Sequence, residues 1–177
     1  TNFPIVSKGV AWTAAEYLFQ VSGADKLSVS LLDQSTGAAQ EVATYATALT
    51  AYEGKWIHVA CTYNGVGGAS ANAGISLYLN GVSVATALTD AGTYVGMEDA
   101  GAAVKIGRFD SDYAKGQIGK VKVWNLELSA TEVKEDYSGV STPFKYRGPN
   151  QTNLWDAAAG VFTSGTYSWT VYGSNTI

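Results

Sequence analysis

Residues 75–85 have the sequence ISLYLNGVSVA, and this stretch decides the fold class. Apolar and polar side chains alternate on both sides of Asn80 and Gly81, which is the pattern of strands with one buried face. The two central residues of a type I′ turn both need a positive φ, and Asn-Gly is a pair that meets this requirement readily. The stretch therefore predicts a β-hairpin with Asn80 and Gly81 in its turn.

The same alternation recurs elsewhere in the chain. Residues 15–21 and 26–32 flank a turn-like link at residues 22–25, and together they predict a second hairpin. Residues 56–63 (WIHVACTY) are rich in β-branched and aromatic side chains, which favours a buried strand. Three more strands are predicted at residues 104–108, 118–124 and 165–173.

A single short helix is predicted near residues 130–137. Ser129 and Glu132 have the spacing of a capping box, in which each side chain accepts a hydrogen bond from the other residue's backbone N–H. Gly139 follows about two turns later and is typical of a helix end. Many short strands with one late helix predict an all-β fold, a two-sheet antiparallel jelly-roll sandwich.

The composition changes after Gly139. Residues 141–150 (STPFKYRGPN) hold two of the three prolines of the chain, which is typical of a linker. We therefore expect a jelly-roll domain over residues 1–139, and a linker or arm over residues 140–177 that ends in a final strand.

The overall composition excludes several classes of protein. The chain has 177 residues, a formal net charge of −4 and only 15% charged residues. A coiled coil or a disordered tail would carry more charge, and a nucleic-acid-binding protein would be basic. No apolar run approaches the roughly 20 residues that span a bilayer, and the first ten residues lack the apolar segment of a signal peptide. We therefore expect neither nucleic acid binding nor membrane insertion.

Six segments carry a resemblance to a known family. They are IVSKG (5–9), GKWIHVACTYNG (54–65), ISLYLNGV (75–82), IGR (106–108), GQIGKVKVWN (116–125) and LSATEV (128–133). In this order they resemble the concanavalin A-like lectin/glucanase superfamily, and within it the laminin G-like jelly-roll domains. The resemblance covers about residues 5–138. The Gly-rich loop that follows TYNG (62–65) and the stretch YVGME (94–98) are similar to those of domains in phage and other microbial surface or virion proteins. This similarity implies an extracellular or virion-surface location.

The chain departs from this family pattern in two places. Family members usually begin with a further pair of strands upstream of residues 5–9, so we expect an open sheet edge there. Either the chain is cut from a longer protein, or residues 167–172 or a second chain cover that edge. The second departure is at Gly119 and Lys120, where the family often has an acidic pair, so a calcium site that depends on those carboxylates would be lost.

Two loops hold the candidate ligand-binding residues. Sugar recognition needs aromatic faces that stack on pyranose rings, with polar groups beside them. Tyr113 lies among Arg108, Asp110 and Asp112 in one predicted loop, and Tyr94 lies in a second. For each residue taken singly, an ordinary loop surface is the alternative interpretation. Taken together, Arg108, Asp110, Asp112 and Tyr113 predict one binding rim, and Tyr94 is a second candidate outside it.

A calcium ion is the cofactor that this rim suggests. Asp110 and Asp112 are at alternating positions of one loop, and calcium binds six to eight oxygens, commonly from such carboxylates and from loop carbonyls. Asp90, Asp99 and Asn80 could contribute from neighbouring loops. The alternative is that Asp-Ser-Asp only forms a turn.

Four other conspicuous residues are expected to be structural. Trp56 and Trp124 lie in strong strand patterns, so we expect them to pack inside or between the sheets. His58 is the only histidine, and without a second metal ligand nearby we expect it to form structural hydrogen bonds. Cys61 is the only cysteine and is expected to be a buried, inert thiol.

The resemblance also raises the possibility of a glucanase. Glycoside hydrolysis needs two carboxylates that face each other across the sugar, and no predicted strand carries closely alternating Glu and Asp. We therefore expect no enzymatic activity. We expect a non-catalytic module that binds a glycan or a host surface receptor within a larger extracellular or virion protein, such as a phage fibre, tail or head protein. The alternative is a structural module that binds no sugar and joins neighbouring subunits through residues 140–177.

Overall fold

The computed structural model describes residues 2–10, 14–35, 39–99 and 101–139, together with the backbone of residues 155–156 and 161–162. The chain forms two compact units, Thr1–Val140 and Ser141–Ile177. In the second unit, β12 (Trp155–Asp156) pairs antiparallel with β13 (Val161–Phe162). The strand predicted at residues 165–173 lies outside the described residues.

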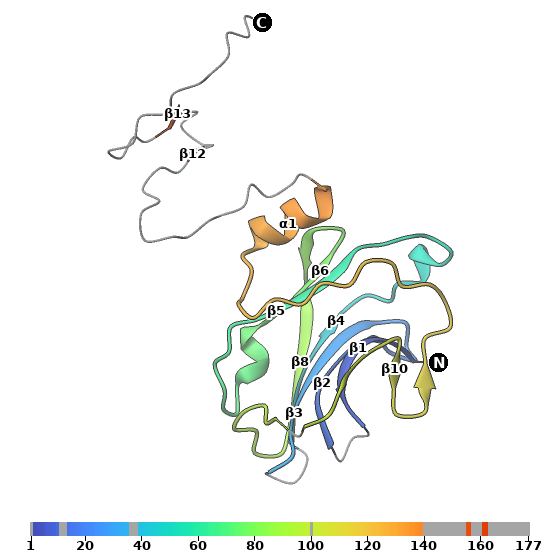
Figure 1. Ribbon diagram of the computed structural model, residues 1–177, viewed down its shortest axis with the longest axis vertical. Coiled ribbons are helices and arrows are strands. Elements are labelled where there is room, and N and C mark those ends of the chain that lie inside the picture. The colour runs from blue at the N-terminus through green and yellow to red at the C-terminus, as the bar shows by residue number, and fades with distance from the viewer. Residues whose placement is uncertain are drawn as a thin grey trace, which may run out of the picture. The chain divides into compact units, whose positions relative to one another are not determined.

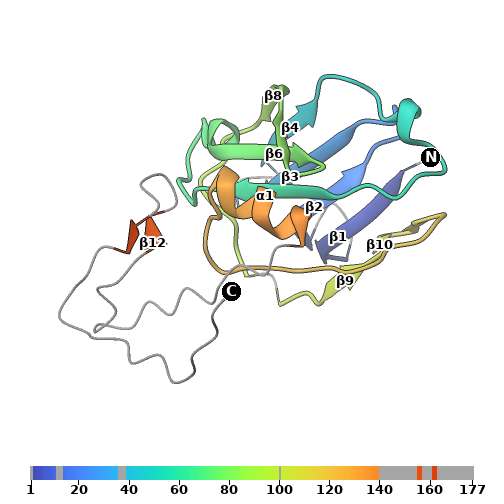
Figure 2. The same ribbon diagram turned by 90° about the horizontal axis from the view of Figure 1, so that it is seen from above.

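Six antiparallel strands form the larger sheet of the first unit, in the order β8-β4-β3-β2-β1-β9 (Figures 1 and 2). Strands β1 to β4 follow one another as a meander, and the chain later adds β8 beside β4 and β9 beside β1. The bounds of the six strands are β1 (Phe3–Gly9), β2 (Ala15–Val21), β3 (Leu27–Asp33), β4 (Ala39–Tyr45), β8 (Thr86–Ala91) and β9 (Val104–Ile106).

The predicted hairpin lies in a second sheet, which has three strands in the order β5-β6-β7. Asn80 and Gly81 form its two-residue turn with φ values of 50° and 76°, so the positive φ expected at both turn positions is confirmed. The Asn80 side chain also accepts a hydrogen bond from the His58 N–H at 3.0 Å. The bounds of the three strands are β5 (Val59–Tyr63), β6 (Ile75–Leu79) and β7 (Val82–Val84).

The main hydrophobic core lies between these two sheets (Figures 1 and 2). Alternate residues of β3 and β6 point into it, because successive side chains of a strand point to opposite faces. The buried apolar members from the strands are Phe19, Leu27, Val29, Leu31, Ala39, Ala43, Ile75, Leu77 and Leu79. The predicted all-β sandwich of two antiparallel sheets is therefore confirmed.

The predicted helix is present as α1 (Ala130–Ser138). Ser129 and Glu132 form both hydrogen bonds of the capping box, and Gly139 ends the helix with a φ of 66°. Val133 is the buried residue that holds α1 to the rest of the unit. Among the described residues, no helix is long and apolar enough to cross a membrane.

The strand predicted at residues 118–124 is wrong. Residues 117–124 have no regular secondary structure, although their side chains alternate in polarity. Two side-chain contacts of this segment are described. Gly119 lies against the Trp56 ring, so that a Cβ at this position would be 3.4 Å from Trp56 Cζ3, and the Lys122 ammonium is paired with the Asp136 carboxylate. The segment therefore contacts neighbouring side chains and forms no strand.

The sheet edges also differ from the expectation. The first strand, β1, is not at an edge, because β9 pairs with it through Val6 and Ile106. That role was expected of residues 167–172 or of a second chain. Strands β4 and β8 were not predicted at all, and β8 lies within a segment that was expected to be a loop.

Two carboxylates are buried inside the sandwich and hold loops by their backbone N–H groups. Asp33, at the end of β3, accepts hydrogen bonds from the N–H groups of Val95 at 2.8 Å and Gly96 at 3.2 Å. Glu41, on β4, accepts from the N–H of Asn72 at 3.2 Å, while its other oxygen has no hydrogen-bond partner. Both side chains are almost fully buried, so they position the loops that follow β5 and β8.

The burial of Glu41 predicts a pH dependence of stability. Burial raises the pKa of the Glu41 carboxyl, the hydrogen bond from Asn72 opposes this, and nearby Asp90 adds to it. The folded state therefore binds this proton more tightly than the unfolded state does. Glu41 thus favours folding most below its ordinary pKa, and this contribution is lost as the pH rises through the raised pKa.

We expect the variant Glu41→Gln to show this dependence, because glutamine cannot ionise. Between pH 4 and pH 7.5, the free energy of unfolding of the variant relative to that of the wild type should rise by on the order of 1 kcal/mol. Urea unfolding at the two pH values measures this change. Equal pH dependence of the two proteins would contradict it.

Candidate functional site

The candidate rim is a short β-hairpin made of β10 (Arg108–Phe109) and β11 (Asp112–Tyr113). Asp110 and Ser111 connect the two strands, and Asp110 has a φ of 50°. Aspartate adopts this left-handed conformation more readily than most residues, which suits it to a tight turn. The loop predicted for this segment is therefore an ordered hairpin.

Phe109 anchors the hairpin to the larger sheet. Its side chain is buried in a second core cluster with Ala15, Leu18 and Leu32. Because neighbouring residues of a strand point to opposite faces, the burial of Phe109 turns Arg108 outward. The cross-strand pairing of Arg108 with Tyr113 then places both on the outer face.

Arg108 and Tyr113 form a cation–π pair on this outer face. The guanidinium carbon of Arg108 lies 5.0 Å from the centre of the Tyr113 ring, within the range of this interaction. The Arg108 Nε also donates a hydrogen bond to the Asp110 carbonyl oxygen at 3.0 Å. Arg108 therefore contacts one part of the Tyr113 ring. Tyr113 remains 56% exposed, so much of its surface stays open to a ligand.

The two aspartates of the rim have different surroundings. Asp110 is exposed in the turn, whereas Asp112 is partly buried and accepts a hydrogen bond from the Asn2 Nδ2 at 2.8 Å. One oxygen of the Asp112 carboxylate therefore already has an amide donor, and its other oxygen has no hydrogen bond to Asn2. Within the described ranges there is no group of three or more His, Cys, Asp or Glu side chains that could hold a metal ion. The structure therefore adds no further acidic ligand to the two that the calcium hypothesis proposed.

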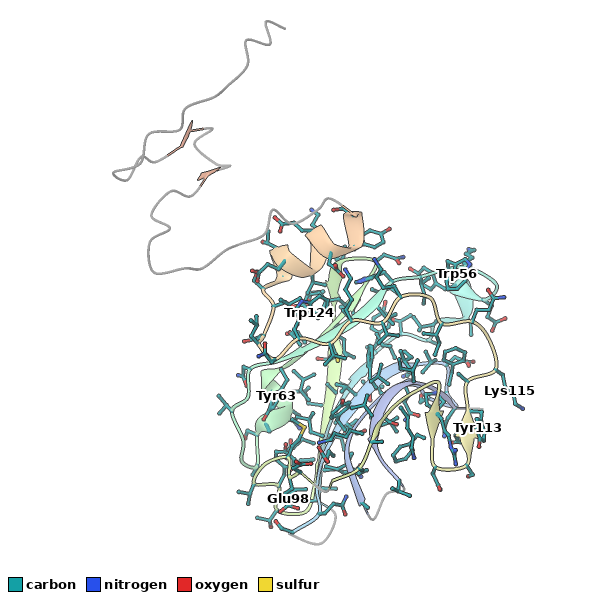
Figure 3. All side chains as sticks on the ribbon, viewed as in Figure 1. Trp56, Tyr63, Glu98, Tyr113, Lys115 and Trp124 are labelled. Atoms are coloured by element: carbon teal, nitrogen blue, oxygen red, sulfur yellow. The ribbon has the colours of Figure 1, made fainter. Side chains whose placement is uncertain are left out.

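A groove of about 1580 Å³ begins beside the hairpin. It is lined by the inner face of β1 to β3, by most of residues 49–65 and by residues 115–128. Asn2 and Lys115 line it, and both adjoin the hairpin, since Asn2 binds Asp112 and Lys115 follows Tyr113 by two residues. In Figure 3, Tyr113, Lys115 and Trp56 follow one another along one side of the unit.

Two tryptophans line this groove, and the sequence analysis placed them wrongly in the core. Trp56 is 70% exposed, and Trp124 is 43% exposed with the Lys122 ammonium 5.7 Å from its ring centre. Their strand patterns predicted burial, but β5 begins only at Val59 and residues 117–124 form no strand. Exposed aromatic rings beside a groove are typical of sites that bind sugars or other flat apolar faces.

Tyr94 was expected to be a ligand-binding residue of a loop, but it is buried. Its side chain is 1% exposed and belongs to the core between the two sheets. Burial raises its hydroxyl pKa far above the ordinary value. Of the five predicted ligand-binding residues, the structure therefore brings Arg108, Asp110, Asp112 and Tyr113 together on one hairpin and leaves Tyr94 in the core.

His58 and Cys61 have structural surroundings. The His58 backbone exchanges hydrogen bonds with Asn80, and its Nε2 lies 3.7 Å from an Asp136 carboxylate oxygen of α1. Burial raises the pKa of the Cys61 thiol to about 12, so it is a thiol and not a nucleophilic thiolate at neutral pH. Among the described residues the hydrogen bonds of His58 are made by its backbone, its Nδ1 has no hydrogen-bond partner, and the Cys61 side chain is only partly exposed.

Comparison with known proteins identifies the domain that carries this site. A family model described as the concanavalin A-like lectin/glucanases superfamily matches residues 2–134, which include the hairpin and almost the whole groove lining. No curated protein and no solved structure matches the chain.

Proposed function

The chain belongs to the concanavalin A-like lectin/glucanase superfamily, and from this premise we propose that it is a non-catalytic module that binds a glycan at the hairpin β10–β11 and in the adjoining groove. The superfamily includes lectins as well as glucanases, and its lectin-like members support a binding module as the general class of function. The finer assignment, a glycan as the ligand, depends on the side chains of the rim.

The position of Tyr113 is the observation that carries this proposal. Phe109 fixes the hairpin from below, and Arg108 holds one side of the Tyr113 ring. A ring that is immobilised before binding loses little side-chain entropy when a sugar stacks on it. The exposed part of the ring therefore suits the apolar face of a pyranose, with the Arg108 guanidinium and the Asp110 carboxylate as neighbouring hydrogen-bonding groups.

The groove extends this contact beyond one sugar ring. Lys115 and Gln117 adjoin the hairpin, and Trp56 and Trp124 lie farther along the same lining. Two exposed aromatic rings in this lining, together with Tyr113 on the hairpin beside it, favour a linear oligosaccharide over a monosaccharide, because each ring can stack on a different sugar unit.

Three carboxylates of the unit already have structural partners and are not free for glycoside hydrolysis. A glycosidase needs one free carboxylic acid and one free carboxylate on facing sides of the sugar. Asp33 and Glu41 are buried and accept hydrogen bonds from backbone N–H groups. Asp136, which lines the groove, is paired with Lys122. These three carboxylates have structural partners, so we assign none of them a catalytic role.

In this proposal the module is displayed on an extracellular or virion surface, where its partner is a glycan or a glycosylated host receptor. The family resemblance to microbial surface and virion domains supports this setting. The alternative, assembly with neighbouring subunits through residues 140–177, concerns residues that the structure leaves almost wholly undescribed.

A glycan array probed with the full chain tests the proposed function. We expect a selective set of glycans to bind, and we expect Tyr113→Ala to weaken that binding by about tenfold, which corresponds to about 1.4 kcal/mol of stacking. Tyr113→Phe keeps the ring and is the matched control, and its affinity should stay within about twofold of the wild type. Trp56→Ala reports whether the ligand extends along the groove.

The same array, repeated with calcium and with a chelator, tests the metal hypothesis. Binding that survives chelation would remove calcium from the mechanism and leave the lectin function intact. Binding that is lost on chelation, and lost again in Asp110→Asn, would restore the calcium site at Asp110 and Asp112. A folded wild-type protein that binds no glycan in either condition would contradict the proposed function.

A further inference from the structure

The sequence Asn-Gly-Val occurs twice in the chain, at residues 64–66 and 80–82. The first copy directly follows β5, and the second directly follows β6, the strand that pairs with β5. An asparagine that precedes glycine is prone to deamidation, because glycine has no side chain to shield its backbone nitrogen. Since the two copies have the same local sequence, a difference in their reactivity has to come from the fold.

Deamidation of such a pair is an intramolecular reaction followed by hydrolysis. The glycine nitrogen loses its proton to solvent and forms a bond to the Cγ of the asparagine, while the side-chain nitrogen takes up a proton and leaves as ammonia. Water then opens the resulting succinimide ring at either carbonyl. One product is aspartate, and the other is isoaspartate, whose main chain runs through the former side chain and is longer by one carbon. Both products carry a carboxylate in place of the amide.

The fold protects the copy that begins at Asn80. The Asn80 N–H donates to the His58 carbonyl oxygen at 2.8 Å, and the Asn80 Oδ1 accepts from the His58 N–H at 3.0 Å. Gly81 is buried, and a Cβ at its position would be 2.8 Å from Cδ1 of the Tyr137 ring of α1. Ring closure therefore requires the Asn80 side chain to leave His58, in a turn that Tyr137 covers.

The copy that begins at Asn64 is open to reaction. Both Asn64 and Gly65 are exposed. The Asn64 Oδ1 accepts a hydrogen bond from the Val66 N–H at 3.0 Å. This bond spans the peptide group of Gly65, so it brings the Asn64 Cγ close to the Gly65 nitrogen, and these are the two atoms that must join. Val66 belongs to the same loop, so the bond does not tie the side chain to another strand as His58 ties Asn80.

We propose that the folded protein deamidates at Asn64, slowly and without an enzyme, whereas Asn80 stays intact. The nucleophile is the Gly65 nitrogen, and the co-reactant is water. The modified chain carries an additional negative charge at a position that lines the groove. The modified fraction increases with time, so it records the age of the molecule. This inference does not rest on the proposed function.

Isoaspartate at position 64 also changes the loop that follows β5. Asn64 lies at the base of this loop, where its N–H donates to the Gly74 carbonyl oxygen at 3.2 Å and its side chain lies against Gly74. Within the loop, the Gly68 N–H donates to the Val95 carbonyl oxygen at 3.0 Å. The longer main chain loosens this closure, so we expect the Gly68 amide to exchange with deuterium at least about threefold faster in the isoaspartyl form. Asn64→Asp keeps the original chain length and, as the matched control, should exchange like the wild type.

Ageing of the full chain, followed by mass spectrometry, tests the site. The folded protein is incubated at neutral and at mildly alkaline pH, and the tryptic peptide of residues 56–105, which contains both copies, is fragmented to assign the amide-to-acid mass change. We expect position 64 to react at least about tenfold faster than position 80. The reaction should be faster at the higher pH, because the attacking nitrogen must lose its proton. Equal rates at the two positions, or an Asn64 that stays unmodified, would overturn the proposal.

The same incubation in guanidinium chloride separates the effect of the fold from that of the local sequence. Both copies are open to attack in the unfolded chain, so we expect their rates to agree within about twofold. A tenfold difference that persists in the unfolded chain would show that the flanking residues select Asn64, and it would overturn the role of the fold. Asn64→Gln, whose longer side chain closes a ring far less readily, should abolish modification at position 64. None of these measurements uses a glycan, so failure of the glycan array leaves this test unaffected.

Discussion

Tyr94→Ala will lower the free energy of unfolding by about 3–5 kcal/mol, the cost of removing an aromatic side chain from a packed core. Tyr94 is the largest of the fully buried side chains and contributes to the core that holds the two sheets together. Alanine would leave a cavity that the surrounding strands cannot fill without moving. Equilibrium unfolding in urea, followed by circular dichroism, measures the loss.

Tyr113→Ala is the matched control, because the sequence analysis gave both tyrosines the same role. Tyr113 is exposed on the hairpin, so its loss should change the free energy of unfolding by no more than about 0.5 kcal/mol. The two variants should therefore differ in both measurements. Tyr94→Ala should lose stability and keep its rim, whereas Tyr113→Ala should lose ligand affinity and keep its stability. Equal stability of the two variants would contradict the core position of Tyr94.

Phe109→Ala is expected to have the second-largest effect, a loss of about 3–5 kcal/mol. Phe109 packs against Ala15, Leu18 and Leu32 and is the buried anchor of the hairpin. Its removal should also release Arg108 and Tyr113 from their fixed positions, so glycan affinity should fall at least as far as in Tyr113→Ala. Urea unfolding and a binding titration of the same sample measure the two effects.

Arg108→Ala is the control for Phe109→Ala, because it changes the adjacent residue of the same strand on the exposed face. We expect it to lower affinity while the free energy of unfolding stays within about 0.5 kcal/mol of the wild type. A Phe109→Ala protein that keeps both its stability and its affinity would show that the hairpin is held in another way.

Features with a local cause were predictable from the sequence. The Asn80-Gly81 turn depends on two adjacent residues that tolerate a positive φ, and the α1 capping box depends on two side chains three residues apart. Both are present as predicted. The strands β2, β3 and β6 were also predictable from their local sequence, although most of their residues are buried and β3 is buried on both faces.

Features that depend on neighbours distant in the sequence were not predictable in this way. β8 is exposed at five of its six positions, so its side-chain pattern gives little indication that it pairs with β4. Residues 117–124 alternate like a strand, yet contacts with Trp56 and Asp136 hold them outside a ladder. In both segments the backbone state is decided by the partner and not by the segment itself.

The candidate site shows the same difference between local features, which were predictable, and features that depend on distant neighbours. The four rim residues from Arg108 to Tyr113 were predicted together because they are close in the sequence, and a two-residue turn keeps them close in space. The aromatic side chains were assigned less well. Tyr94 was expected at the surface and is buried, whereas Trp56 and Trp124 were expected in the core and are exposed. An aromatic side chain suits either environment, so its residue type alone does not decide between them.

The order of strands in the larger sheet has a consequence for how the protein folds. The meander of β1 to β4 joins strands that are consecutive in the sequence. The pairs Val6–Ile106 and Gln40–Ala91, in contrast, join strands that are far apart in the sequence. Closing such long loops costs chain entropy before stabilising contacts form. This cost slows folding. Until both closures are made, the backbone groups of β1 and β4 that will bind β9 and β8 can pair with other chains instead. Dilution during refolding should therefore favour the native sheet over aggregates.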